Sequence, residues 1–157
     1  MLTYASTCRE TEAPEIAEHA KRLPVWCDAP EESISPVLVV DDDPDIAPLV
    51  ELAMRPFRIP MESVASGAEA IERFKERTYN LVILDLAMGD VHGFDVLRQL
   101  RGLPQVSRTP VLILTANATH EALARSFGYG ADEFVKKPFD VCELGMRAFR
   151  LIRPFDH

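Results

Sequence analysis

Residues 81–101 read LVILDLAMGDVHGFDVLRQLR, and this stretch decides the fold. Its first four residues are a short, continuous apolar run, which is typical of a strand buried on both faces of a parallel sheet. Asp85 ends the run, a loop follows, and Gly93 opens a helix rich in apolar residues. A buried strand followed by a loop and a covering helix is the repeating unit of an α/β fold.

The same unit recurs on both sides of this stretch. Helices are predicted at about 45–54, from 66 onward, from 93 onward, at 119–127 and at 140–152. Strands are predicted at 37–40, 62–65, 81–84, 110–114 and 133–136. Because parallel strands need right-handed crossovers, five such units predict an α/β, flavodoxin-like, doubly wound fold. Its five-stranded parallel sheet has the order 2-1-3-4-5, with helices on both faces.

The composition of the chain changes near residue 35. We expect residues 1–35 to be an N-terminal extension that is partly disordered or forms a short helix. The regular pattern predicts one domain over 36–153, followed by a short tail at 154–157. Only 20 residues follow Lys137 in the 157-residue chain. The chain is therefore either a stand-alone domain or a fragment of a longer protein.

The bulk properties limit the classes of function. The net charge of −8 argues against direct binding of nucleic acid, since that affinity rests on basic residues. No run approaches the roughly 20 apolar residues that span a bilayer, and no signal peptide is recognised at the start. We therefore expect a cytoplasmic protein with no membrane contact. The three cysteines have no framework spacing, and we expect reduced thiols.

Polar residues stand where the predicted strands end. In a parallel sheet the carboxyl ends of the strands share one edge, so residues that are distant in sequence converge there. These strand-end residues are Asp41, Asp42, Asp85, Thr115 and Lys137.

Together these side chains point to phosphoryl transfer. Clustered carboxylates repel one another, and Mg²⁺ relieves this repulsion because it prefers oxygen ligands. An ammonium and a hydroxyl add contacts for the oxygens of a phosphoryl group, and one carboxylate can attack phosphorus to give an aspartyl phosphate. Taken singly, each residue has a plainer explanation as a helix cap, a turn former or a solvated charge. Four strand ends that each carry what one reaction needs favour the joint explanation.

The same segments carry a family resemblance. Together with residues 81–101, they are VLVVDDDPDI at 37–46, TPVLILTANA at 109–118 and GADEFVKKPFD at 130–140. They resemble, in the same order, the receiver domains of response regulators in two-component signal transduction, including the chemotaxis regulators.

The resemblance implies a role for each matched position. Asp85 would be the phosphoacceptor, Thr115 would hydrogen-bond the phosphoryl group and Lys137 would pair with it. Phe134 would be a switch aromatic that moves inward together with Thr115, and a cis peptide would precede Pro138. The implied Mg²⁺ ligands are Asp42, Asp85 and the backbone carbonyl of Ala87, with Asp41 acting mainly through metal-bound water.

The resemblance also implies partners. A sensor histidine kinase or a phosphotransfer domain would donate the phosphoryl group. A downstream protein, or a second copy of the chain, would contact the face built from the helix at 119–127, the strand at 133–136 and the helix at 140–152. The chain would not be an enzyme, apart from its own phosphorylation and dephosphorylation. Two residues depart from the pattern: Gly89 stands where a proline is usual, and His92 where an acidic residue is common.

Two alternatives remain at this point. A phosphatase of the haloacid-dehalogenase type also uses an aspartate nucleophile with Mg²⁺, but it places that nucleophile on the first strand. The other alternative is a receiver-like interaction module that works without phosphorylation. All five polar residues are present, which argues against it.

Overall fold

The computed structural model describes residues 35–88 and 92–152. It contains a five-stranded parallel sheet with the order β2-β1-β3-β4-β5. The strands span Val37–Val40 (β1), Met61–Val64 (β2), Leu81–Leu84 (β3), Val111–Thr115 (β4) and Glu133–Lys136 (β5). The predicted doubly wound α/β fold is therefore confirmed.

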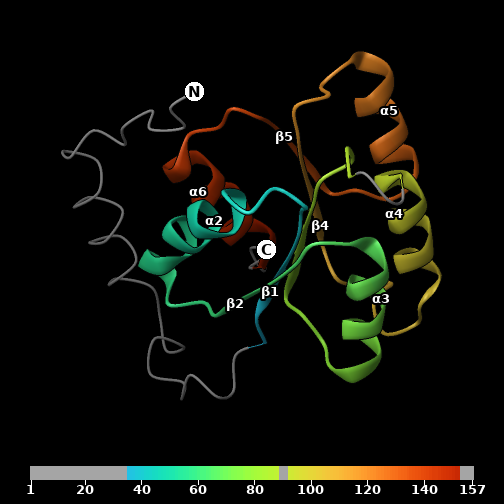
Figure 1. Cartoon of the computed structure of the whole chain (residues 1–157), viewed down its shortest axis with the longest axis horizontal. Coiled ribbons are helices and arrows are strands. Elements are labelled where there is room, and N and C mark those ends of the chain that lie inside the picture. Colours follow the sequence, from blue (N-terminus) through green and yellow to red (C-terminus); the bar gives the residue numbers. More distant parts are fainter. Residues whose placement is uncertain (1–34, 89–91, 153–157) are drawn as a thin grey trace, which may run out of the picture.

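Helices cover both faces of the sheet. Figure 1 shows α2 and α6 on one side of the strands and α3, α4 and α5 on the other. The helices span Ile46–Met54 (α2), Gly67–Glu76 (α3), Gly93–Gly102 (α4), His120–Gly128 (α5) and Val141–Ile152 (α6), and a 3₁₀ turn, Arg55–Phe57 (η3), follows α2. Because helices cover both faces, side chains from different strand ends meet at the two ends of the sheet.

Side-chain caps fix where several helices begin. Ser66 Oγ accepts a hydrogen bond from the backbone N–H of Glu69 at the start of α3. Thr119 Oγ1 accepts one from Ala122 at the start of α5. Such caps satisfy N–H groups that the first helical turn leaves unpaired.

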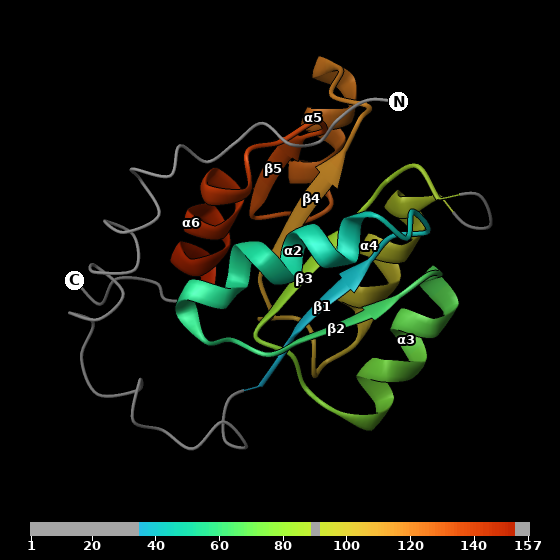
Figure 2. The ribbon, with the colours of Figure 1, turned by 60° about the vertical axis from the view of Figure 1, so that its left-hand side comes forward.

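The strands are aligned so that their carboxyl ends lie together. Val40 of β1 pairs with Leu84 of β3, and Thr115 of β4 pairs with Lys136 of β5. Figure 2 shows the strands running in the same direction. Residues that follow these positions therefore meet at one edge.

Two hydrophobic clusters hold the layers together. One joins the sheet to α3 and α4 through residues such as Leu38, Phe74 and Leu97. The other joins it to α2 and α6 through residues such as Ile83 and Leu144. Full burial of such a side chain stabilises the fold by roughly 1.5–3 kcal/mol. With β1, β3 and β4 buried throughout, the middle of the sheet is a rigid base for the residues at its edge.

Some expectations are corrected or lie outside the described residues. The predicted extension at 1–35 lies outside them except for its last residue, and the tail at 154–157 and Gly89 lie outside them entirely. The expectation of reduced thiols is wrong for Cys142, which is disulfide-bonded. Sequence spacing says nothing about which thiols meet in space. Among the described residues, no helix has the length and apolar character needed to cross a membrane.

Candidate functional site

Four strand ends deliver the predicted residues to the same edge of the sheet. The backbone continues the parallel ladder there: Asp85 donates its N–H to the carbonyl of Val40 at 3.0 Å. Lys137 donates its N–H to the carbonyl of Thr115 at 2.9 Å. These bonds hold each residue in register with its neighbour, so the side-chain geometry of the site follows from that of the sheet.

Three carboxylates form the acidic part of the site. One oxygen from each of Asp41, Asp42 and Asp85 lies within 4.8 Å of the other two. Asp41 and Asp85 are buried, whereas Asp42 is exposed at the mouth of the cluster. Oxygen donors at this spacing suit a hard cation such as Mg²⁺ or Ca²⁺.

Lys137 brings a positive charge to this cluster. Its Nζ donates a 2.6 Å hydrogen bond to Asp41 Oδ2 and lies 3.4 Å from Asp85 Oδ2. Burial acts to lower the pKa of the Lys137 ammonium, but the hydrogen bond to Asp41 and the charges of Asp41 and Asp85 outweigh it and raise that pKa. The lysine is therefore held in its charged form.

Negative charge still exceeds positive charge among these residues. Burial raises the pKa of the Asp41 carboxyl, against the opposing hydrogen bonds from Lys137 and the Asp43 backbone. One ammonium cannot neutralise three carboxylates. This donor set fits a divalent cation, which would supply the missing positive charge.

The site side chains are fixed by one local pattern. Asp41 Oδ1 accepts the backbone N–H two residues later, at 2.9 Å. Asp85 Oδ1 accepts the N–H of Ala87 at 3.1 Å, and Thr115 Oγ1 accepts the N–H of Asn117 at 3.3 Å. Short polar side chains commonly stabilise turns in this way. The ends of β1, β3 and β4 are therefore each followed by a turn that a candidate site side chain stabilises.

The predicted switch residues lie on neighbouring strands. Thr115 is fully buried at the end of β4. Phe134, on β5, is partly buried, packs against the cluster under α3 and α4, and pairs with Ile113. Phe134 therefore lies two residues before the strand-end position that pairs with Thr115. The cis peptide before Pro138 is present as expected.

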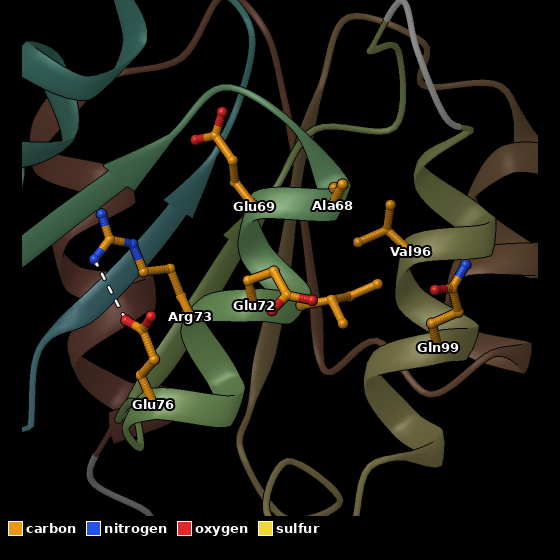
Figure 3. A pocket seen from close by; sticks show the side chains of 9 residues that line it. Ala68, Glu69, Glu72, Arg73, Glu76, Val96 and Gln99 are labelled. Carbon is orange, nitrogen blue, oxygen red and sulfur yellow. Dashed lines mark ion pairs between the residues drawn. The ribbon is translucent and has the colours of Figure 1, made fainter.

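A hollow of about 590 Å³ lies elsewhere, between α3 and α4 (Figure 3). Residues such as Glu69, Arg73 and Gln99 line it. None of the five strand-end residues is among its lining. The candidate site at the sheet edge is therefore separate from this hollow.

Comparison with known proteins gives the family. The family model for the response regulator receiver domain matches residues 37–148 of the sequence. The chain belongs to this family.

Similar proteins show how far the likeness extends. The cell cycle response regulator CtrA of Brucella ovis is 38% identical to the receiver domain over 117 residues, which are 74% of this chain and 50% of the relative. A solved response regulator from Chloroflexus aurantiacus superposes with a TM-score of 0.71 at 28% identity, over 76% of this chain and 98% of the other. The chemotaxis protein CheY4 of Vibrio cholerae gives 0.70 at 26% identity, over 77% and 100%.

Family membership settles part of the interpretation. The protein is a receiver domain of two-component response regulators, and none of these matches supports the phosphatase alternative. Such domains generally accept a phosphoryl group without turning over a separate substrate. The chain spans about half the length of the curated relatives that it matches.

One well-connected residue of the receiver domain was not predicted. Arg101, on α4, donates to the carbonyls of Val106, Thr109 and Gly130 and to the carboxylate of Asp132. Asp132 also accepts the N–H of Val111 at the start of β4. These partners are mostly backbone carbonyls, so no sequence pattern identifies them. Arg101 ties α4 to the end of the sheet opposite the carboxylates.

Proposed function

We propose that Asp85 accepts a phosphoryl group from a histidine kinase or a phosphotransfer domain. The observation that carries this proposal is the buried contact of Lys137 with both Asp41 and Asp85, which lie in one cluster with Asp42. In the transfer, an Asp85 carboxylate oxygen forms a bond to phosphorus as the bond from phosphorus to the histidine nitrogen of the donor breaks. The histidine is released as the leaving group.

The proposed cofactor is Mg²⁺. Asp42, Asp85 and the backbone carbonyl of Ala87 would hold it directly, and Asp41 would act through metal-bound water. When bound, the ion would neutralise charge that builds up on the phosphoryl oxygens. Asp42 suits this role because it is the exposed member of the cluster and is accessible to an ion from solvent.

Two further side chains would act on the phosphoryl group. The Lys137 ammonium already lies beside Asp85 and would pair with a phosphoryl oxygen. The Thr115 hydroxyl accepts a backbone N–H and still has its own O–H to donate, so it would turn toward the phosphoryl group. Movement of Thr115 would leave space that Phe134 enters from the neighbouring strand.

The output would be read on the face formed by α5, β5 and α6. Leu123 and Phe127 on α5 and Met146 on α6 are exposed, at 37%, 45% and 49% of their surface. Leu123 and Phe127 are four residues apart on α5, and neighbouring exposed apolar side chains support a contact surface there. A downstream protein or a second copy of the chain would contact these side chains differently in the phosphorylated and unphosphorylated states.

We also propose the limits of the unit and its compartment. The receiver domain would run over 36–153, with 1–35 as an extension and 154–157 as a tail. A phosphoryl donor of the histidine kinase type would be met in the cytoplasm.

The test is chemical phosphorylation. Acetyl phosphate with Mg²⁺ should increase the intact mass of the protein by one phosphoryl group, and chelation of Mg²⁺ should prevent this. Asp85→Asn should abolish the increase, because the amide cannot form an acyl phosphate.

Asp45→Asn is the matched control. Asp45 is exposed, lies close in sequence to Asp42 and makes no side-chain cap. The Asp45→Asn variant should gain a phosphoryl group to the same extent as the wild type. If Asp85→Asn takes up the phosphoryl group as readily as Asp45→Asn, the proposal is wrong and a phosphorylation-independent module gains support.

A further inference from the structure

Helices α4 and α5 meet through an arginine that lies against two aromatic rings. The guanidinium carbon of Arg125, on α5, is 4.3 Å from the ring centroid of Phe94 and 5.9 Å from that of Tyr129. The two ring centroids are 5.9 Å apart. Both guanidinium distances lie within the range at which a cation is attracted to a ring face. We call Phe94, Arg125 and Tyr129 the α4–α5 stack.

The stack is the main contact of the Arg125 head group. Within residues 35–88 and 92–152, its guanidinium makes neither an ion pair nor a hydrogen bond. Arg101, by contrast, has all its contacts with carbonyls and a carboxylate. The position of Arg125 therefore depends on where Phe94 places its ring.

Phe94 is in turn tied to the Asp85 turn. The preceding residue, Gly93, donates its N–H to the carbonyl of Leu86 at 3.2 Å. A Cβ at Gly93 would come within 2.4 Å of Leu86 Cα and 2.7 Å of the Asp85 carbonyl oxygen, so the start of α4 lies directly against this backbone. The same turn is braced by the hydrogen bond from Ala87 to Asp85 Oδ1. A group added to that carboxylate would therefore act on the turn against which the start of α4 packs.

Helix α5 is lightly anchored to the sheet. It buries only two small side chains, Ala122 and Ser126, while Leu123 and Phe127 face outward. Since hydrophobic stabilisation scales with the apolar area buried, the core holds the body of this helix weakly, whereas the hydrogen bonds from Arg101 to the Gly130 carbonyl fix the chain just after its last turn. Within the helix itself, the cation–π contact of Arg125 with Phe94 is therefore a sizeable part of what holds α5 against α4.

We propose that the α4–α5 stack holds α5 in its unphosphorylated position and so sets how readily a phosphoryl group on Asp85 moves this helix. Phe94 and Arg125 are then positioning residues. The inference rests on the proposed function of Asp85 and adds a second route to α5 beside Thr115 and Phe134. Because coupling between two sites is reciprocal, weakening the stack must also change the affinity of the Asp85 site for a phosphoryl analogue.

The test uses beryllofluoride with Mg²⁺ as the analogue, on the full chain. Arg125→Met keeps side-chain length and loses the charge. It should bind beryllofluoride roughly two- to fivefold more tightly by ¹⁹F NMR, since that is the effect of one exposed cation–π contact. Without the analogue, its α5 amide resonances should already be displaced toward the positions of the bound wild type.

Three further variants make the test specific. Phe94→Leu should also bind beryllofluoride more tightly and show displaced α5 amide resonances. Arg125→Lys keeps the charge, so its affinity and its α5 amide resonances should lie close to those of wild type. Arg98→Met removes an exposed arginine from α4 outside the stack and should match wild type, which controls for lost charge.

The possible outcomes separate the two proposals. Unchanged or weaker binding in both Arg125→Met and Phe94→Leu, with α5 amides as in wild type, would overturn the role of the stack. If wild-type binding of beryllofluoride does not depend on Asp85, the proposed function itself fails.

Discussion

At the scale of single residues, the site depends on the balance of charge around Lys137. The side chains of Lys137, Asp41 and Asp85 are each no more than 7% exposed. Buried charges are tolerated when they are paired, and removal of one partner leaves the others without compensation. Lys137 therefore stabilises the folded state independently of any phosphoryl group.

This leads to a prediction for Lys137→Met. Without divalent cations, the variant should lose about 2–4 kcal/mol of unfolding free energy, because two buried carboxylates lose their counter-charge. Urea denaturation measures it. Lys136→Met is the control, since Lys136 is the adjacent exposed lysine and should change stability by less than about 0.5 kcal/mol. Equal losses in the two variants would show that the buried contact does not stabilise the fold.

At the scale of elements, the start of α4 packs directly against the backbone of the Asp85 turn. Gly93 has no room for a Cβ, because backbone atoms of Asp85 and Leu86 occupy that space. The other end of α4 is different, since a Cβ at Gly102 would meet nothing within 4 Å. One helix thus offers a constrained glycine and a free one.

The two glycines make a paired prediction. Gly93→Ala should lower the unfolding free energy by about 1–3 kcal/mol through overpacking, and should slow labelling of Asp85 because its turn is displaced. Gly102→Ala should be neutral or raise stability by up to about 1 kcal/mol. Thermal melts and the acetyl phosphate assay measure both. If Gly93→Ala is as stable and as readily labelled as Gly102→Ala, the close packing described here is wrong.

At the scale of the whole molecule, most of the fold follows from the sequence. The strands at 37–40, 81–84 and 133–136 were predicted to the residue. For the first two, short apolar runs with abrupt polar ends mark buried parallel strands. β2 begins one residue earlier than predicted. It is an edge strand with mainly half-exposed side chains, so its periodicity is weak.

The convergence of the five strand-end residues was predictable, but the contacts among them were not. Parallel topology brings the five strand-end residues to one edge, whatever their separation in sequence. It cannot tell that Lys137 lies closer to Asp41 than to Asp85, which depends on rotamers. Nor could it identify Arg101 or the α4–α5 stack, whose contacts depend on helix packing.

The metal should stabilise the entire fold. A ligand that binds only the folded state, at about a hundred times its Kd, raises the unfolding free energy by about 2.7 kcal/mol. Mg²⁺ should do so for wild type and for Asp45→Asn, and much less for Asp42→Asn. Chemical denaturation with and without a chelator measures the difference. Equal stabilisation of Asp42→Asn would remove Asp42 from the proposed ligands.

The central claim is that one carboxyl among the 25 acidic residues carries the phosphoryl group. The most direct measurement is borohydride reduction of the protein after acetyl phosphate treatment, followed by peptide mass spectrometry. Reduction converts a phosphorylated aspartate to homoserine and so records its position. We expect homoserine at position 85 alone, dependent on Mg²⁺. Homoserine at another aspartate, or none in a protein that has gained the mass of a phosphoryl group, would contradict it.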